Sequence, residues 1–477
     1  MIKTMKTLIK NGTVVTASDS IIADVLIEDE KVIALGANLP GEDANVIDAR
    51  GKFILPGGID VHTHLELVMM GTVSSDDFYS GHRAAAFGGT TSHIDFACQY
   101  KDESLKQALD NWRAKLQGKP VIDYGFHITI TDPTDAVIDE IPSMIDEGIT
   151  TIKLLLAYKG RLQVDDTAMF KIMQKAGEHG MLTMIHAENG DAIQILIDQS
   201  VAANRLSPVD HVLTRPHWAE AEATLRAISL AAMADAPVYI VHMTCQSSVE
   251  QLMYARSRGL KAMGETCPHY LFFTIDHLRR PDGAKWVCSP PFRTESDNEF
   301  LWKSLAQNNL QVVGTDHCPF FFDGTKEIQY EDKRLKIPGK ELGKDNFTLI
   351  PNGVPGIEDR MPILWSYGVR RGIISMNRFV ELCCTNPAKI FGMYPRKGTI
   401  AVGSDADIVI WNPNLKKTVS VVNTHQRTDY NLYEGMELIG LPEKVFVRGN
   451  MIVDGEKWLG KAGQGKFLKR AAGAAVM

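Results

Sequence analysis

Short apolar runs alternate with longer amphipathic segments from Gly57 to about residue 394, and this alternation limits the fold most. The runs that have the length and residue types of strands are IDVHTH, TTSHIDF, VIDYGFHITI, ITTIKLLLAY, MLTMIHAE, PVYIVHMT, GLKAMGETC and QVVGTDHC. Segments between them, such as ESLKQALDNWRAKLQ, have helical spacing. Near-continuous apolar strands separated by helices are typical of a parallel sheet buried on both faces. The repeats predict an α/β fold, a (β/α)8 TIM barrel. A doubly wound open sheet is the alternative, but its glycine-rich phosphate-binding turn is absent.

The two ends of the chain differ from this middle part. Stretches such as TLIKNGTVVT and KGTIAVGSDADIVIWNP carry alternating apolar residues between Asn-Gly and glycine turns, which is typical of short strands. They predict one small β-sandwich domain built from residues 1–56 and 395–459, beside a barrel of residues 57–394. The tail, residues 460–477, is basic and rich in small residues. We expect it to be loose or to dock on a neighbouring subunit.

Cysteine usage and charge exclude several classes of protein. The seven cysteines are odd in number and form no CxxC pair, which favours free thiols in a reducing compartment. No apolar stretch approaches the roughly 20 residues of a membrane span, and the N-terminus lacks the apolar core of a signal peptide. The formal net charge of −7 argues against nucleic acid or an anionic membrane as partner. We therefore predict a cytoplasmic protein.

Polar side chains recur at the carboxyl ends of the predicted barrel strands. His62 and His64 are two residues apart in one strand, so they project to the same side. Four other strands carry candidates near their ends: Lys153, His186, His242 and Asp316. These strand ends meet at one mouth of a barrel. One such histidine alone is more often a hydrogen-bonded core or rim residue. The joint pattern predicts a site for a divalent cation.

Lys153 and the remaining histidines have ordinary explanations too. His82, His179 and His277 fall on helical or loop segments, where exposure to solvent suffices. Lys153, in the apolar run IKLLL, must be paired, lose its proton or be modified. A buried ion pair or a side chain that reaches solvent would satisfy it. A sharper hypothesis is that its neutral amine reacts with CO₂ to form a carbamate, which could bridge two cations.

Motifs in the same order along nearly the whole chain resemble the dihydropyrimidinase/D-hydantoinase family of the amidohydrolase superfamily. They are PGGIDVHTHLE, GGTTSHIDF, IKLLLAYKG, IHAENGD, YIVHMTC, GETCPHYL, SPPFR, GTDHCPF, IPNGVPGIEDR and KGTIAVGSDADIVIWNP. The resemblance implies a distorted (β/α)8 barrel with a β-sandwich built from both termini. It also implies a homotetramer with two Zn²⁺ ions per subunit, Mn²⁺ or Co²⁺ being possible instead.

The resemblance implies roles for single residues as well. Those that resemble metal ligands are His62, His64 and Asp316 for a buried ion, His186 and His242 for a more exposed ion, and Lys153 as a bridging N6-carboxylysine. Tyr158 resembles the hydroxyl that stabilises the oxyanion. Ser289 and Asn352 resemble residues whose main-chain groups hold the substrate ring.

The implied activity is the hydrolytic ring opening of cyclic ureides and imides, as in pyrimidine catabolism. 5,6-Dihydropyrimidines and 5-substituted hydantoins would give N-carbamoyl amino acids. A hydroxide held by two metal ions would attack the carbonyl group, and Asp316 would carry its proton to the leaving nitrogen. Met69 or Met70, in LELVMMGTVSSDD, is a candidate wall for the exocyclic group, with ordinary loop packing as the alternative.

Three other functions share this framework. Dihydroorotases typically carry an arginine two residues after the second histidine, where this chain has Glu66, which would repel an anion. Allantoinases match SPPFR and IPNGVPGIEDR less well. Non-enzymatic scaffolds of the collapsin response mediator type have lost metal ligands, whereas all six candidates are present here.

Overall fold

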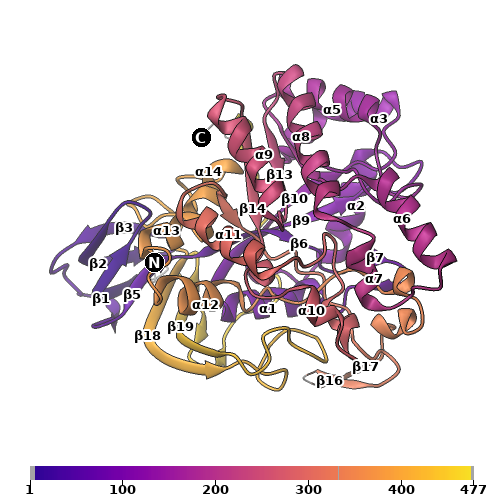
Figure 1. The fold of residues 1–477 in the computed structure, drawn as a ribbon. Helices are drawn as coiled ribbons and strands as arrows, with labels where there is room; N and C mark the ends of the chain where they lie inside the picture. Colours follow the sequence, from indigo (N-terminus) through magenta and orange to yellow (C-terminus); the bar gives the residue numbers. More distant parts are fainter. Residues whose placement is uncertain (1–5, 331, 474–477) are drawn as a thin grey trace.

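A parallel barrel forms the larger part of the protein (Figure 1). The computed structural model describes residues 6–330 and 332–473. Eight strands form one sheet in the order β15-β14-β13-β12-β11-β10-β9-β6. Their bounds are β6 (Gly58–Thr63), β9 (Thr90–Cys98), β10 (Asp123–Thr129), β11 (Thr151–Leu155), β12 (Leu182–His186), β13 (Val238–Ile240), β14 (Ala262–Thr266) and β15 (Val312–Val313). Thr63 and His317 form a parallel bridge that nearly closes the sheet. The predicted (β/α)8 barrel is therefore confirmed.

Helices cover the outside of this barrel. They are α1 (Phe78–Phe87), α2 (Leu105–Leu116), α3 (Asp135–Glu140), α4 (Ser143–Asp146), α5 (Asp166–Glu178), α6 (Gly190–Ala202), α7 (Pro208–Leu213), α8 (His217–Met233), α9 (Gln246–Ser257), α10 (Ile275–Leu278), α11 (Glu295–Ala306), α12 (Arg360–Leu364), α13 (Met376–Val380) and α14 (Asn386–Ile390). Helix α2 shows why they form. The Ser104 side chain accepts a hydrogen bond from Gln107 N at its start, and the buried residues Leu105, Leu109 and Trp112 follow helical spacing. Within residues 6–330 and 332–473, every helix is too short or too polar to cross a membrane.

Strands from the two chain ends form a second, mostly antiparallel sheet. Its nine strands are β1 (Lys6–Val15), β2 (Ser20–Glu28), β3 (Lys31–Gly36), β4 (Ala44–Asp48), β5 (Phe53–Pro56), β18 (Ile408–Thr418), β19 (Glu437–Val447), β20 (Asn450–Asp454) and β21 (Lys457–Trp458). Strand β5 pairs antiparallel with β18, which joins the indigo and yellow ends of the chain in Figure 1. The apolar side chains of Val25, Ile54 and Ile408 belong to a separate core. The predicted β unit built from both ends is confirmed.

The last described residues return to the barrel of their own chain. Tyr124 N donates to Lys466 O at 3.0 Å, and Leu468 N donates to Tyr124 O at 2.7 Å. Leu468 is buried among apolar residues inside the barrel. The buried Arg470 guanidinium donates to Thr151 Oγ1 at 2.9 Å, at the amino end of β11. This segment therefore packs at the end of the barrel opposite the strand carboxyl ends. Docking of the tail on a neighbouring subunit stays a prediction.

Candidate metal centre and active-site cavity

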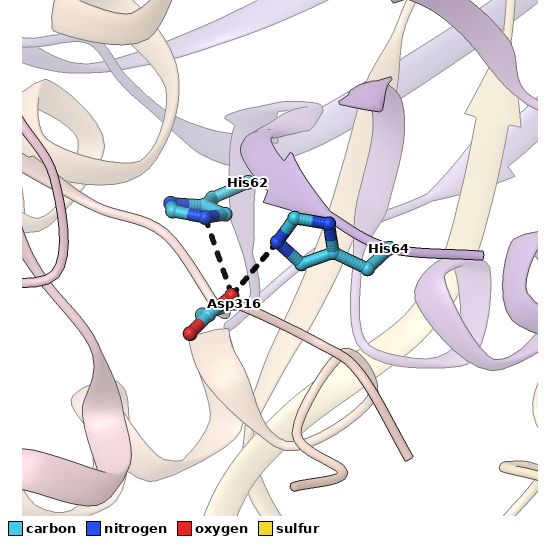
Figure 2. Close-up of side chains that lie close together, drawn as sticks. All are labelled: His62, His64 and Asp316. Carbon is cyan, nitrogen blue, oxygen red and sulfur yellow. Dashed lines mark ion pairs between the residues drawn. The ribbon is translucent and has the colours of Figure 1, made fainter. Parts of the chain in front are cut away.

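Three predicted ligands converge at the mouth of the barrel (Figure 2). His62 lies in β6, His64 directly follows that strand, and Asp316 lies three residues after β15. Asp316 Oδ1 is 3.2 Å from His62 Nε2 and 3.0 Å from His64 Nε2. All three ligand atoms lie within 4.8 Å of one another. Burial alone would raise the pKa of Asp316, but the neighbouring histidines have a larger, opposite effect. The pKa of Asp316 therefore lies well below its usual value.

A second pair of histidines adjoins this group. His186 is the last residue of β12, and His242 follows β13 by two residues. His186 Nδ1 and His242 Nε2 face each other at 2.9 Å. The rings of His62 and His242 have centroids 5.3 Å apart, so the pair and the triad share one space. Two imidazole nitrogens that face each other in this way suit a shared cation.

Lys153 lies between these groups without a partner. It is 4% exposed, and its Nζ lies 5.1 Å from the ring centroid of Phe96. No hydrogen bond or ion pair joins this amine to any residue in the described part of the chain. Burial lowers the pKa of Lys153 to about 8, although Asp316 and Glu265 act in the opposite direction. Neither ordinary explanation, an ion pair or a solvent-exposed amine, matches this placement.

Two buried carboxylates orient the histidines from behind. Glu265, in β14, hydrogen-bonds His62 Nδ1 and accepts from the Tyr239 hydroxyl at 2.9 Å. Glu188 Oε2 lies 2.8 Å from His186 Nε2. A carboxylate on one ring nitrogen directs the other nitrogen toward the centre. The sequence interpretation missed both residues, although an acidic residue near the end of the apolar strand AMGET was a usable signal.

The gathered donors fit a pair of divalent ions. They comprise four imidazole nitrogens, one carboxylate and one buried amine at the mouth of a single barrel. Imidazole and carboxylate ligands suit zinc and also manganese or cobalt. The six predicted residues therefore line one cavity, and their binding of two metal ions stays a prediction.

The three predicted substrate contacts also lie together. Asn352 Nδ2 donates to Ser289 Oγ at 3.2 Å. Burial raises the pKa of Tyr158, and hydrogen bonds with Ser289 and Asn352 oppose this change. Asn352 Oδ1 is buried and has no hydrogen-bond partner among the described residues. These side chains share with the candidate ligands a cavity of about 270 Å³, which we call the active-site cavity.

Backbone strain marks the same site. Tyr158, His242 and Asp316 have φ values of 65°, 40° and 49°. This left-handed region costs an L-residue other than glycine roughly 1–2 kcal/mol. Asn and Asp, which include Asp316 and most other residues in this region, tolerate it better. The cost therefore falls mainly on Tyr158 and His242, whose side chains line the active-site cavity.

Loops and a small hairpin supply much of the remaining lining of the active-site cavity. Besides the candidate ligands and substrate contacts, the lining includes Leu67, Val68, Met69, Met70, Gln99, Tyr100, Thr131, Leu155, Arg161 and Leu162. Residues 68–73 form the small hairpin of β7 (Val68–Met69) and β8 (Thr72–Val73). Both methionines singled out from the sequence therefore line the cavity. Their effect on specificity stays a prediction.

Glu66 lies outside the active-site cavity. It is not among the residues that line the active-site cavity, and its carboxylate pairs with Lys119 Nζ at 2.8 Å. Its φ of 53° belongs to a turn that directs the chain away from β6. The side chain is engaged outside the cavity, and the expectation that Glu66 repels an anionic substrate stays a prediction.

A buried lysine that the sequence interpretation missed joins two substrate-contact segments. Lys340 is 1% exposed, and its Nζ donates to Val287 O at 2.8 Å and to Pro351 O at 3.2 Å. These carbonyl groups lie next to the segments that carry Ser289 and Asn352. Burial lowers the pKa of Lys340 to about 7. One amine thus fixes the spacing of both segments.

The interpretation of His82 was wrong. His82 is completely buried, where Val121 N donates to its Nδ1 at 3.0 Å and its Nε2 lies 2.7 Å from His93 Nε2. It connects α1 to β9 instead of facing solvent. His179 is exposed and His277 is half-buried, as their segments suggested.

Comparison with known proteins gives one consistent result. The model of the Amidohydrolase family matches residues 53–452. A D-hydantoinase from Geobacillus stearothermophilus is 46% identical over 99% of this chain and 98% of its own length. A dihydropyrimidinase from Rattus norvegicus is 40% identical over 97% of this chain and 88% of its own length. The crystal structure of a dihydropyrimidinase from Brevibacillus agri NCHU1002 superposes with a TM-score of 0.94 at 50% identity, covering 98% of this chain and 99% of that one.

Proposed function

The chain belongs to the dihydropyrimidinase and D-hydantoinase branch of the amidohydrolase family, and we propose on this basis that it hydrolyses cyclic ureides. It is a cyclic amidase that opens 5,6-dihydropyrimidines and 5-substituted hydantoins to N-carbamoyl amino acids. The observation that carries the proposal is the convergence of six candidate ligands beside Tyr158, Ser289 and Asn352 in one cavity.

Within this proposal, the six candidates would hold two divalent ions, zinc by family resemblance. His62, His64 and Asp316 would hold one ion, His186 and His242 would hold the other, and Lys153 would serve both. When bound, the ions supply Lewis acidity, which makes water nucleophilic near neutral pH and withdraws electrons from a carbonyl group. Allantoinase and scaffold functions have no specific observation in their favour here.

The residues of the chain then divide the remaining work. Asp316 accepts a proton from the attacking water and delivers it to the ring nitrogen as the C–N bond breaks. The Tyr158 hydroxyl donates to the oxygen that becomes negative, and one such donor contributes about 3 kcal/mol. The segments of Ser289 and Asn352 hold the ring in place. Their mutual contact at 3.2 Å supports a joint role.

Lys153 is proposed to be carboxylated. Its amine attacks CO₂, a C–N bond forms, and the nitrogen releases a proton, which leaves an anionic carbamate. The reaction needs the neutral amine, and the lowered pKa of about 8 makes that form accessible. A carbamate supplies the negative charge and the oxygen ligands that a lysine lacks. Its charge offsets part of the charge of two cations.

The wider setting is proposed on the same basis. We propose a homotetramer, as the family resemblance implies, and a cytoplasmic role in pyrimidine catabolism. Trp218 and Met233 on α8 are 67% and 66% exposed, which is consistent with contact between subunits. All seven cysteines are free thiols, which is consistent with a reducing compartment.

A substrate panel tests the activity. The zinc-loaded protein is assayed with dihydrouracil, hydantoin, 5-phenylhydantoin, allantoin and dihydroorotate, and N-carbamoyl products are quantified. We expect turnover of the first three compounds above the last two. Turnover restricted to allantoin or dihydroorotate would contradict the assignment. A folded protein that binds no metal in elemental analysis would favour a scaffold.

A further inference from the structure

Arg161 stands at the border of two hollows. It lines the active-site cavity and also an adjoining groove of about 690 Å³, bordered by α6 and α7. Met70, Tyr158 and Asn352 line both spaces as well, so the groove continues outward from the catalytic residues. Arg161 is exposed, and no hydrogen bond or ion pair of its side chain to any described residue is found.

A tight turn fixes the position of this arginine relative to the catalytic tyrosine. Arg161 N and Leu162 N donate to Tyr158 O at 3.0 and 3.1 Å. Leu155 and Gln163 form a parallel bridge, which ties the outgoing chain back to the end of β11. Gly160 supplies the left-handed residue of the turn, with a φ of 74°. The guanidinium therefore projects from a braced segment three residues after Tyr158.

No carboxylate among the residues that the structure describes pairs with Arg161. Asp316 is the one carboxylate among the described residues that line the active-site cavity, and it already contacts His62 and His64. In the groove, Asp198 accepts a hydrogen bond from Gln194 Nε2 at 2.8 Å. Lys159, two residues before Arg161, has a partner, since its Nζ lies 2.6 Å from Asp191. An unpaired cation at this mouth is notable in a protein with a net charge of −7.

Several other residues that line the active-site cavity with Arg161 are apolar, among them Leu67, Met70, Leu155 and Leu162. A ligand in this cavity would therefore meet aliphatic side chains as well as the guanidinium. The guanidinium is planar and matches a carboxylate with two parallel hydrogen bonds.

We propose that Arg161 binds a carboxylate at the end of the exocyclic substituent, so that the enzyme prefers cyclic ureides with an acidic side chain over their neutral counterparts. The inference rests on the proposed function and names the substrate class for the same site. Such substrates carry a short aliphatic stem on the ring carbon and an acid group at its end. Hydantoin-5-acetate and hydantoin-5-propionate are the simplest examples.

The test compares each acid with its own primary amide, which has the same shape and no charge. In the wild-type enzyme we expect kcat/KM to be higher for the acid, and the preference to shrink with added salt because the contact is partly exposed. Arg161→Gln is expected to lower the acid-to-amide ratio of kcat/KM about fivefold to thirtyfold, mainly through KM. Arg161→Lys should retain part of the preference.

Lys159→Gln is the matched control, because Lys159 is an exposed cation on the same turn that does not line the active-site cavity. It should leave the ratio unchanged. An equal effect of both substitutions, or no preference in the wild type, would overturn the role of Arg161. If dihydrouracil itself is not hydrolysed, the proposed function fails instead. Calorimetric binding of hydantoin-5-acetate then decides the matter, since equal Kd values for wild type and Arg161→Gln would overturn the inference.

Discussion

The inner end and the mouth of the active-site cavity are built from different kinds of structure. At the inner end, the side chains come from barrel strands or the residues directly after them, and most are buried. At the mouth, they come from the β7–β8 hairpin and from the turn after Tyr158, and several are exposed. Strands fix the position of a side chain through many neighbours, whereas loops tolerate change. The comparison suggests that reaction chemistry and substrate choice can vary separately in this protein.

The residues that hold the functional side chains in place strengthen this contrast. His62 and His186 are each held by a buried carboxylate, from Glu265 and Glu188. No described residue gives the side chain of Arg161, at the mouth, comparable support. Substitutions at the inner end should therefore abolish turnover, and substitutions at the mouth should shift ratios between substrates.

The largest effect is expected for Lys153→Ala, which removes the proposed bridge. We expect a loss of at least about 1,000-fold in kcat, together with loss of bound metal, because the ligands would be left without a shared anion. Elemental analysis and a dihydrouracil assay measure both. Short-chain carboxylic acids should restore part of the activity by replacing the carbamate. Two metals per chain with normal turnover in the variant would show that Lys153 is not the bridge.

Tyr158→Phe should have the next largest effect. Removal of one oxyanion donor is expected to lower kcat about 100-fold, with metal content unchanged and little change in KM. Timed activity assays and elemental analysis on the same preparation distinguish this fall in kcat from a loss of metal. A variant with wild-type kcat would exclude the hydroxyl from the reaction.

Lys340→Met tests the buried lysine that joins the segments carrying Ser289 and Asn352. Because burial lowers the pKa of Lys340 to about 7 in the folded protein, against 10.5 for an ordinary lysine, the unfolded chain binds more protons between these values. Wild-type stability should therefore rise relative to the variant as the pH increases, by about 2 kcal/mol between about pH 7 and pH 9. Urea unfolding midpoints of both proteins measure this difference.

The control for that experiment is Lys159→Met, since Lys159 is exposed. Its stability difference from the wild type should not depend on pH in the same range. A pH-independent difference for Lys340→Met would mean that the Lys340 amine is not neutralised on folding.

The smallest effect is expected at the apolar part of the mouth. Met70→Ala should lower the rate ratio of 5-phenylhydantoin to dihydrouracil about threefold to tenfold, because a contact worth about 1 kcal/mol with the larger substituent is lost. Leu349→Ala is the control, since Leu349 lines the groove but not the active-site cavity. If Met69→Ala and Met70→Ala both leave the ratio unchanged, ordinary loop packing explains these residues.

Much of the fold and the inner end of the site followed from the sequence. The apolar runs matched all eight barrel strands. The six candidate ligands lie at one end of the barrel, in the same cavity as Tyr158, Ser289 and Asn352. The supporting groups did not follow from it. Glu265 has no signature in spacing, because its partner His62 comes from another strand, whereas Glu188 lies only two residues after its partner His186.

Local sequence determined the barrel and the direction of the ligand side chains. Alternation along a strand sets the face on which a residue lies, and parallel strand order sets the end of the barrel at which it emerges. Tertiary structure alone decided that Glu66 pairs with Lys119, that His82 is buried against His93 and that Lys340 spans two carbonyl groups. It also decided that Arg161 has no counter-ion among the described residues. The state of a polar side chain depends on partners brought together from distant segments, and only the folded chain specifies which partners those are.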